Sequence, residues 1–152
     1  MGHVVKFWIA MAQLNLKPIA TEVAVGCYQL RIGTRVDVQC LDANGNNVII
    51  ENKTGFNGYY DQFGSHRMHH PYDLQTDSPH NQHQLQLLMT VELFQRTFTH
   101  LTVVKAFVIR YHNQGSSIYP LENWCTHGRN ALLQLTQQNI NQPKTSSSHI
   151  SK

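Results

Sequence analysis

The sequence has few cysteines, few charged side chains and no long hydrophobic run. Its 152 residues include only Cys27, Cys40 and Cys125, and their wide spacing without a Cys-x-x-Cys pair argues against a disulfide framework, a zinc ribbon or an iron–sulfur site. No apolar stretch approaches the roughly 20 residues that span a bilayer, and the first 16 residues lack a small-residue cleavage site. We therefore expect a soluble, intracellular protein without a membrane partner, and nothing distinguishes nucleus from cytoplasm.

Charge is also too scarce to identify a partner. Charged residues make up 14% of the chain and hydrophobic residues 41%, which is globular composition, and the formal charge of +3 permits a nucleic-acid partner without demonstrating one. The length suits one domain. We place that domain at residues 1–140 and expect residues 141–152 to form a flexible polar tail.

The hydrophobic pattern predicts an α/β fold with a mixed central sheet of four or five strands. Apolar residues recur at helical spacing over 3–16 and again over 80–98, so these two helices should flank the sheet. The Asn-Gly pair at 44–45 predicts a type I′ hairpin between two strands. The other expected elements are strands at 21–25, 27–32, 34–41, 48–53, 101–112 and 116–121, and a final helix at 122–140 that is interrupted near Gly128.

Two predicted strands carry charges where apolar residues would be expected. Side chains alternate along a strand, so Glu51 and Lys53 share a face, and Asp37 can lie near Glu51 across the hairpin if the return strand splays. These charges could form a solvated salt-bridge cluster, which contributes little to stability. Two neighbouring carboxylates repel unless a cation lies between them, however, and oxygen ligands of this kind suit Mg²⁺ or Mn²⁺.

The segment "RVDVQCLDANGNNVIIENKTG" resembles the core of the PD-(D/E)xK nuclease superfamily. In that family an Asp on one strand is followed by a hairpin and by Glu-x-Lys on the next strand, here Asp37 and Glu51-Asn52-Lys53. Glu22 in "ATEVAV" is similar to the upstream acidic residue of the lambda-exonuclease-like and RecB-like branches. The segment "HNQHQLQLLMTVELF" is similar to their helix that begins with a Gln motif.

The resemblance implies a restriction-endonuclease-like core and a role for each matching residue. Asp37, Glu51, the backbone carbonyl of Asn52 and Glu22 would hold Mg²⁺ or Mn²⁺, and Lys53 would orient or help deprotonate the attacking water. The motif glutamine is expected at Gln84. The Gln-x-Gln pattern leaves Gln86 as the alternative, and Gln84 could instead be a buried residue that only satisfies backbone groups.

The function implied is that of a Mg²⁺-dependent deoxyribonuclease, an exonuclease acting at DNA ends in replication, recombination or repair, in a virus or mobile element. A structure-specific endonuclease or junction resolvase is the alternative within the enzyme class. A catalytically silent nucleic-acid-binding module is the alternative outside it. DNA is the expected partner, and a homo-oligomer and a partner protein of recombination or replication both stay open.

The polar stretch between the hairpin and the second helix contains aromatic, basic and histidine side chains. Stacking on bases and contacts with phosphate would suit it to lie over a nucleic-acid strand, and an ordinary solvent-exposed loop is an equal contender. A dedicated histidine metal site is a further, weaker alternative, because no cysteine lies nearby. The expected nucleic-acid contacts are Arg35, Tyr59, Tyr60 and Arg67, and the clustered histidines are His66, His69, His70, His80 and His83.

Overall fold

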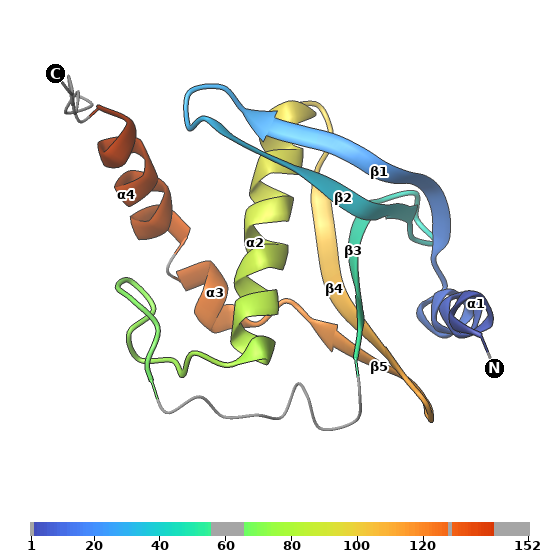
Figure 1. Ribbon diagram of the computed structural model, residues 1–152. Helices are drawn as coiled ribbons and strands as arrows, with labels where there is room; N and C mark the ends of the chain where they lie inside the picture. The colour runs from blue at the N-terminus through green and yellow to red at the C-terminus, as the bar shows by residue number, and fades with distance from the viewer. Residues whose placement is uncertain (1, 56–65, 128, 142–152) are drawn as a thin grey trace, which may run out of the picture.

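The computed structural model describes residues 2–55, 66–127 and 129–141. These residues form a five-stranded mixed sheet with helices against it, so the predicted α/β class is confirmed (Figure 1). The elements are α1 (His3–Leu14), β1 (Lys17–Cys27), β2 (Ile32–Leu41), β3 (Asn47–Thr54), α2 (Pro79–Thr97), β4 (Val103–His112), β5 (Gly115–Pro120), α3 (Asn123–His127) and α4 (Arg129–Asn141).

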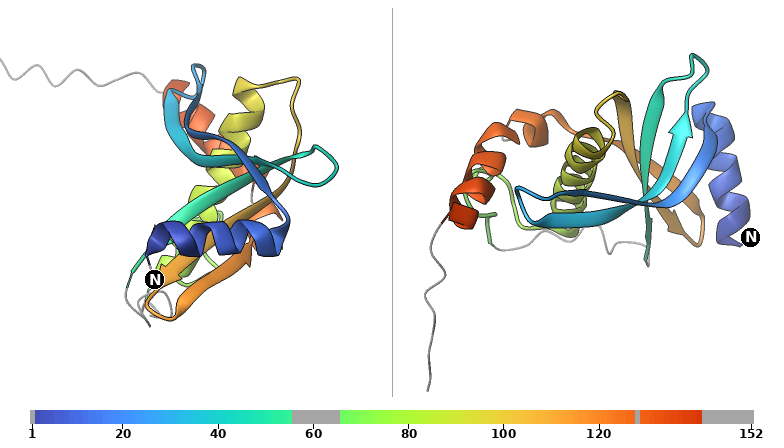
Figure 2. Two further views of the ribbon diagram at one scale, coloured as in Figure 1. Left: turned by 90° about the vertical axis from the view of Figure 1, so that its right-hand side faces the viewer. Right: turned by 90° about the horizontal axis from the view of Figure 1, so that it is seen from above.

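The strands lie in the order β1-β2-β3-β4-β5, and only the β3–β4 pair is parallel. A parallel pair needs a crossover connection, and α2 lies on that connection. β3, the middle strand, therefore has a hairpin partner on one side and a crossover partner on the other. Its side chains face α2 and α1 alternately, because the two helices lie on opposite sides of the sheet (Figures 1 and 2).

Each face of the sheet has its own hydrophobic core. The core on the α2 side joins Ile49 of β3 to Phe94 and Leu87 of α2, all fully buried. The core on the α1 side joins Ile50 of β3 to Met11 of α1. Successive side chains of β3 thus point to opposite faces of the sheet, and both faces are covered.

The helices begin and end near the predicted positions. Ser78 caps α2 by accepting a hydrogen bond from the backbone N–H of Asn81 at 3.3 Å, and Pro79 occupies the first helical position, where its missing N–H costs nothing. The expected final helix is divided into α3 and α4 on either side of residue 128. Within the residues that the structure describes, no helix is both long and apolar enough to cross a membrane.

Two local predictions are corrected. Residues 28–31 form a turn and not part of a strand, because β1 and β2 pair as a hairpin from Cys27 and Ile32 onward. The turn between β2 and β3 is not of type I′, since Gly45 has a positive φ of 79° and Asn44 does not. The Asp42 carboxylate replaces that geometry by accepting the backbone N–H groups of Asn44 and Asn46, each at 2.9 Å.

Candidate functional site

Three carboxylates lie in one row across β1, β2 and β3. Thr21 pairs with Val38 and Val23 with Val36, so Glu22 is opposite Asp37. The last β2–β3 pair is Val38 with Ile50, and the next position in that register sets Asp37 opposite Glu51. The separate acidic residues of the sequence are therefore neighbours across the sheet.

The strands open at this row. Neither Glu22 with Asp37 nor Asp37 with Glu51 is a ladder pair, and Glu22 has a positive φ of 53°. A left-handed conformation costs a non-glycine residue about 1–2 kcal/mol, and strain of this kind gathers at functional sites. Val36 and Val38 show the same break, because residues two apart should share a face and these two belong to opposite cores.

The splayed strands bring Asp37 onto the backbone of β3. Its Oδ2 accepts the backbone N–H of Asn52 at 2.8 Å and so takes the place of a ladder hydrogen bond. In extended backbone the N–H and C=O of one residue point to the same side, so the Asn52 carbonyl also faces Asp37. The Asn52 side chain lies on the other face, where its Oδ1 accepts a hydrogen bond from the Tyr111 hydroxyl at 2.8 Å.

Glu51 is the buried carboxylate of the site, and Lys53 lies half-buried beside it. Glu51 is 3% exposed, its Oε1 lies 3.1 Å from the Lys53 amine, and its Oε2 is buried with no hydrogen-bond partner among the described residues. The Lys53 amine also donates to Gln86 Oε1 at 2.7 Å. A buried carboxylate oxygen without a donor is costly, and a cation is the partner that would satisfy it.

The electrostatics of the carboxylates agree with this geometry. Burial raises the pKa of Glu51, the charge of Asp37 raises it further, and Lys53 opposes both. Burial also raises the pKa of Asp37, against the hydrogen bond from Asn52 and the charge of Lys53. The charge of Glu22 adds to both shifts, so the three carboxylates repel one another across the row.

Glu22 itself differs from the other two carboxylates. Its side chain is 63% exposed and its Oε2 lies 3.8 Å from Arg35, which is 71% exposed. Within the described residues, no group of three or more His, Cys, Asp or Glu side chains is close enough to hold a metal ion. The donor set that the structure brings together is thus Asp37, Glu51 and the Asn52 backbone, with Glu22 outside it.

The expectation for Gln84 is corrected. Gln84 is fully buried, its amide donates to the Pro120 carbonyl at 3.1 Å, and its Oε1 accepts the backbone N–H of Glu122 at 2.9 Å. It fastens α2 to the chain that leaves β5, and the glutamine that contacts Lys53 is Gln86. The apolar stripe that pointed to Gln84 marks the core, whereas Gln86 lies at the exposed border of that stripe.

The predicted nucleic-acid contacts are only partly described. Tyr59 and Tyr60 lie outside the described residues. Arg67 donates to the Leu74 carbonyl at 3.0 Å and so holds its own loop. Arg35 lies next to the row of three carboxylates, because it contacts Glu22. The interpretation of the histidines as a metal site gains no support, because His80 contacts Glu122 and His70 lies 3.6 Å from Asp73 without joining a larger group among the described residues.

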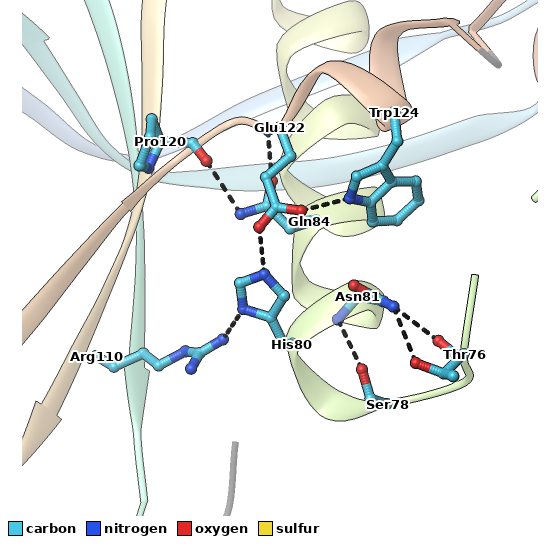
Figure 3. A network of polar contacts seen from close by, with 9 residues as sticks. All are labelled: Thr76, Ser78, His80, Asn81, Gln84, Arg110, Pro120, Glu122 and Trp124. Carbon is cyan, nitrogen blue, oxygen red and sulfur yellow. Dashed lines mark hydrogen bonds and ion pairs between the residues drawn. The ribbon is translucent and has the colours of Figure 1, made fainter. Parts of the chain in front are cut away.

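A polar network at the start of α2 was missed by the sequence reasoning. His80 contacts Arg110 of β4 through Nδ1 and Glu122 through Nε2, and Trp124 donates to the same carboxylate (Figure 3). The available signal was Arg110, a charge directly after the apolar run Ala106–Ile109 of β4. A separate cavity of about 490 Å³ on another side of α2 is lined by residues that include Glu92, Lys105 and Arg129, and none of the predicted site residues lines it.

Comparisons with known proteins leave the family open. No family model matches the chain, and no curated protein matches it. Among solved structures, the chain is similar to the crystal structure of SSO0001, with a TM-score of 0.41 and 18% sequence identity over 93% of this chain. The chain spans 59% of the length of that protein. Because the TM-score is below 0.5, the likeness supports no functional conclusion.

Proposed function

We propose that this chain is a metal-dependent deoxyribonuclease of the PD-(D/E)xK type, with a restriction-endonuclease-like core. The observation that carries the proposal is the meeting of buried Glu51 with half-buried Asp37 and Lys53, in which one Glu51 oxygen has no donor among the described residues. A salt-bridge cluster on an exposed face was the alternative. The burial of Glu51, at 3% exposure, is hard to reconcile with a solvated cluster.

The residues present fit a hard divalent cation. Mg²⁺ and Mn²⁺ prefer oxygen ligands and leave positions for water and phosphate oxygens, and Asp37, Glu51 and the Asn52 carbonyl offer such oxygens on one side of β3. A bound cation would neutralise charge on the phosphate and lower the pKa of the attacking water. Either ion would also remove the repulsion that raises the pKa values of Asp37 and Glu51.

Lys53 has the position to work on the attacking water and on the phosphate. Glu51 and Gln86 hold its amine from two directions, at 3.1 and 2.7 Å, so the amine is oriented before a substrate arrives. A fixed ammonium stabilises the negative charge that develops on a phosphodiester during attack. Gln86 is a positioning residue in this scheme, since it touches Lys53 and not the reacting atoms.

The proposal is tested by incubating the purified protein with DNA in Mg²⁺, in Mn²⁺ and in EDTA. We expect cleavage with either metal and none in EDTA. Lys53→Ala should remove cleavage and leave DNA binding largely intact, because one ammonium is a modest share of the phosphate contacts. Lys105→Ala is the matched control, since Lys105 is an exposed lysine on β4 away from the site.

The form of DNA that is degraded identifies the kind of nuclease. Linear duplex, single-stranded, nicked-circle and four-way-junction DNA are offered side by side. Loss of the linear forms alone would indicate an exonuclease acting at ends, in keeping with a role in replication, recombination or repair. Cutting of closed or branched forms would indicate an endonuclease or junction resolvase. DNA binding without cleavage of any form in either metal would contradict the enzyme proposal and favour a silent binding module.

A further inference from the structure

A second cation lies beside Lys53 on the same face of the sheet. Lys53 of β3 is the register partner of Arg110 of β4, and Glu51 is the partner of Val108, so the two cations form a row adjacent to the carboxylate row. Neighbouring strands are about 4.8 Å apart, which makes Lys53 and Arg110 close neighbours. Arg110 is 3% exposed, the same fraction as Glu51.

The contact between Arg110 and His80 fixes the position of the guanidinium and shows which ring nitrogen of His80 is the acceptor. A guanidinium only donates hydrogen bonds, so Nδ1 of His80 must be the acceptor in their contact. Nε2 of His80 then carries the proton and donates it to the Glu122 carboxylate (Figure 3). The imidazole ring of His80 thus links the Glu122 carboxylate to the Arg110 guanidinium.

Further contacts hold Arg110 and Glu122, the two residues that His80 connects. The guanidinium carbon of Arg110 lies 4.1 Å from the centre of the Tyr119 ring. At the other end, Trp124 donates to the Glu122 carboxylate, and Gln84 holds the Glu122 backbone N–H at 2.9 Å. Stacking and hydrogen bonding from several directions leave the guanidinium little rotational freedom.

His83 is affected by the positive charges of Lys53 and Arg110. Burial lowers the pKa of His83 to about 4, and the charges of Lys53, Arg110 and His80 lower it further. His83 is therefore neutral at neutral pH. Lys53 and Arg110 supply positive charge next to the carboxylate row.

We propose that Arg110 is a second phosphate-binding residue of this site, and that His80 and Glu122 position it. The inference rests on the proposed function, and it identifies the ligand of Arg110 as a backbone phosphate of the nucleic-acid strand next to the scissile phosphate. A planar guanidinium suits two phosphate oxygens, and a prearranged one loses little freedom on binding. Burying an arginine with a histidine and a carboxylate is costly in a core that only has to fold, whereas a phosphate site needs that fixed charge.

The test measures DNA binding in EDTA, so that it does not depend on cleavage. The affinity of a fluorescently labelled oligonucleotide duplex is followed by anisotropy from low to high salt. Arg110→Met should weaken binding roughly uniformly across sequences and reduce the slope of log K against log salt by about 0.9, the value for one phosphate contact. Arg129→Met is the matched control, because Arg129 lies 3.1 Å from Glu92 and away from the site, and it should leave the slope unchanged.

A second set of variants separates positioning from folding. Arg110→Lys keeps the positive charge but cannot donate two parallel hydrogen bonds to a phosphate. The slope of log K against log salt should therefore stay at the wild-type value, and the cleavage rate should fall roughly 10-fold or more. His80→Phe should weaken binding in the wild-type background and add nothing in the Arg110→Met background, since it acts through Arg110. Thermal melting of each variant reports whether it is folded.

The outcomes for this inference and for the nuclease proposal are distinct. A folded Arg110→Met or Arg110→Lys protein with the wild-type salt slope and the wild-type cleavage rate would overturn the role of Arg110 while leaving the nuclease intact. A reduced slope in a protein that cleaves no DNA would support the phosphate site and contradict the nuclease. If Arg110→Met does not fold, Arg110→Lys is the variant that tests the inference. DNA binding and cleavage by Arg110→Lys equal to those of wild type would then overturn it.

Discussion

The two faces of β3 are built from the same strand and serve different needs. On the α1 side, Val48 and Ile50 are fully buried in an apolar core. On the α2 side, Ile49 is equally buried, but the next residue on that face is Glu51, at 3% exposure, followed by Lys53. The apolar side chains on the α1 face are explained by the needs of folding alone. The α2 face places a carboxylate where an apolar side chain would stabilise the sheet, and this difference indicates a demand other than stability.

The unfavourable features of the molecule gather on that α2 face. They include the raised pKa values of Asp37 and Glu51, the Glu51 oxygen without a donor among the described residues, and the positive φ of Glu22. Each lowers the free energy of unfolding, and each would be relieved or put to use by a bound cation. A functional site is the most economical explanation of their coincidence.

The largest expected effect comes from Glu51→Gln. Losing the buried one of the two carboxylates that would hold the cation should reduce cleavage by roughly 10²–10³-fold, the range for removing a group that stabilises transition-state charge. The free energy of unfolding, measured in urea, should not fall, because the change removes a buried charge. A strongly destabilised Glu51→Gln protein would instead indicate that Glu51 has a structural role.

The next effect separates the two glutamines of α2. Gln84→Ala leaves the Glu122 N–H and the Pro120 carbonyl without partners and should lower the free energy of unfolding by about 1–3 kcal/mol. Gln86→Ala frees the Lys53 amine and should mainly reduce kcat, with an unchanged melting temperature. Urea denaturation and steady-state kinetics on both variants measure the contrast. The reverse pattern would restore Gln84 as the motif glutamine.

A smaller effect is expected on the apolar face. Ile50→Val removes one methylene from the α1-side core and should lower the free energy of unfolding by about 0.5–1.5 kcal/mol. The cleavage rate of the folded protein should stay at the wild-type value, because Ile50 points away from the site. A fall in kcat comparable to that of Glu51→Gln would show that the two faces are not independent.

The smallest effect is the dependence of stability on pH without metal. Because the folded-state pKa of Glu51 is raised, its contribution to stability is present below its ordinary pKa of 4.5 and is lost as pH rises through the folded value. The advantage of Glu51→Gln over wild type should therefore be greatest at pH 7.5 and shrink as Glu51 becomes protonated. The lowered pKa of His83, about 4, makes the His83 contribution to the free energy of unfolding change with pH in the opposite direction. Wild type and Glu51→Gln are therefore compared with each other at each pH. An advantage that does not change with pH would contradict the raised pKa.

Local pattern predicted much of the fold and part of the site. Helical spacing located α1 and α2, and Asn44-Gly45 located the hairpin. Those signals are local. The turn at 28–31 was mistaken for a strand because Leu30, a buried residue, continued the apolar pattern.

The missed parts of the site depend on contacts between distant segments. The pairing of Lys53 with Arg110 comes from the parallel β3–β4 register, and the contact of His80 with Glu122 joins residues 42 positions apart. The choice between Gln84 and Gln86 depends on how far α2 is rotated against the sheet. Helical period alone does not fix that rotation, and the structure places Gln84 in the core and Gln86 at the exposed border of the apolar stripe.

The central claim is that Asp37 and Glu51 hold a divalent cation on the α2 face of β3, and calorimetric titration with Mn²⁺ tests it most directly. We predict that Mn²⁺ binds one site in the wild-type protein, that the binding weakens as pH falls and the carboxylates become protonated, and that the Asp37→Asn, Glu51→Gln double variant does not bind. The Asp42→Asn variant, which changes an exposed carboxylate in the β2–β3 turn, should bind like wild type. Equal binding by the wild-type protein and the folded double variant, or no binding by either, would contradict the claim.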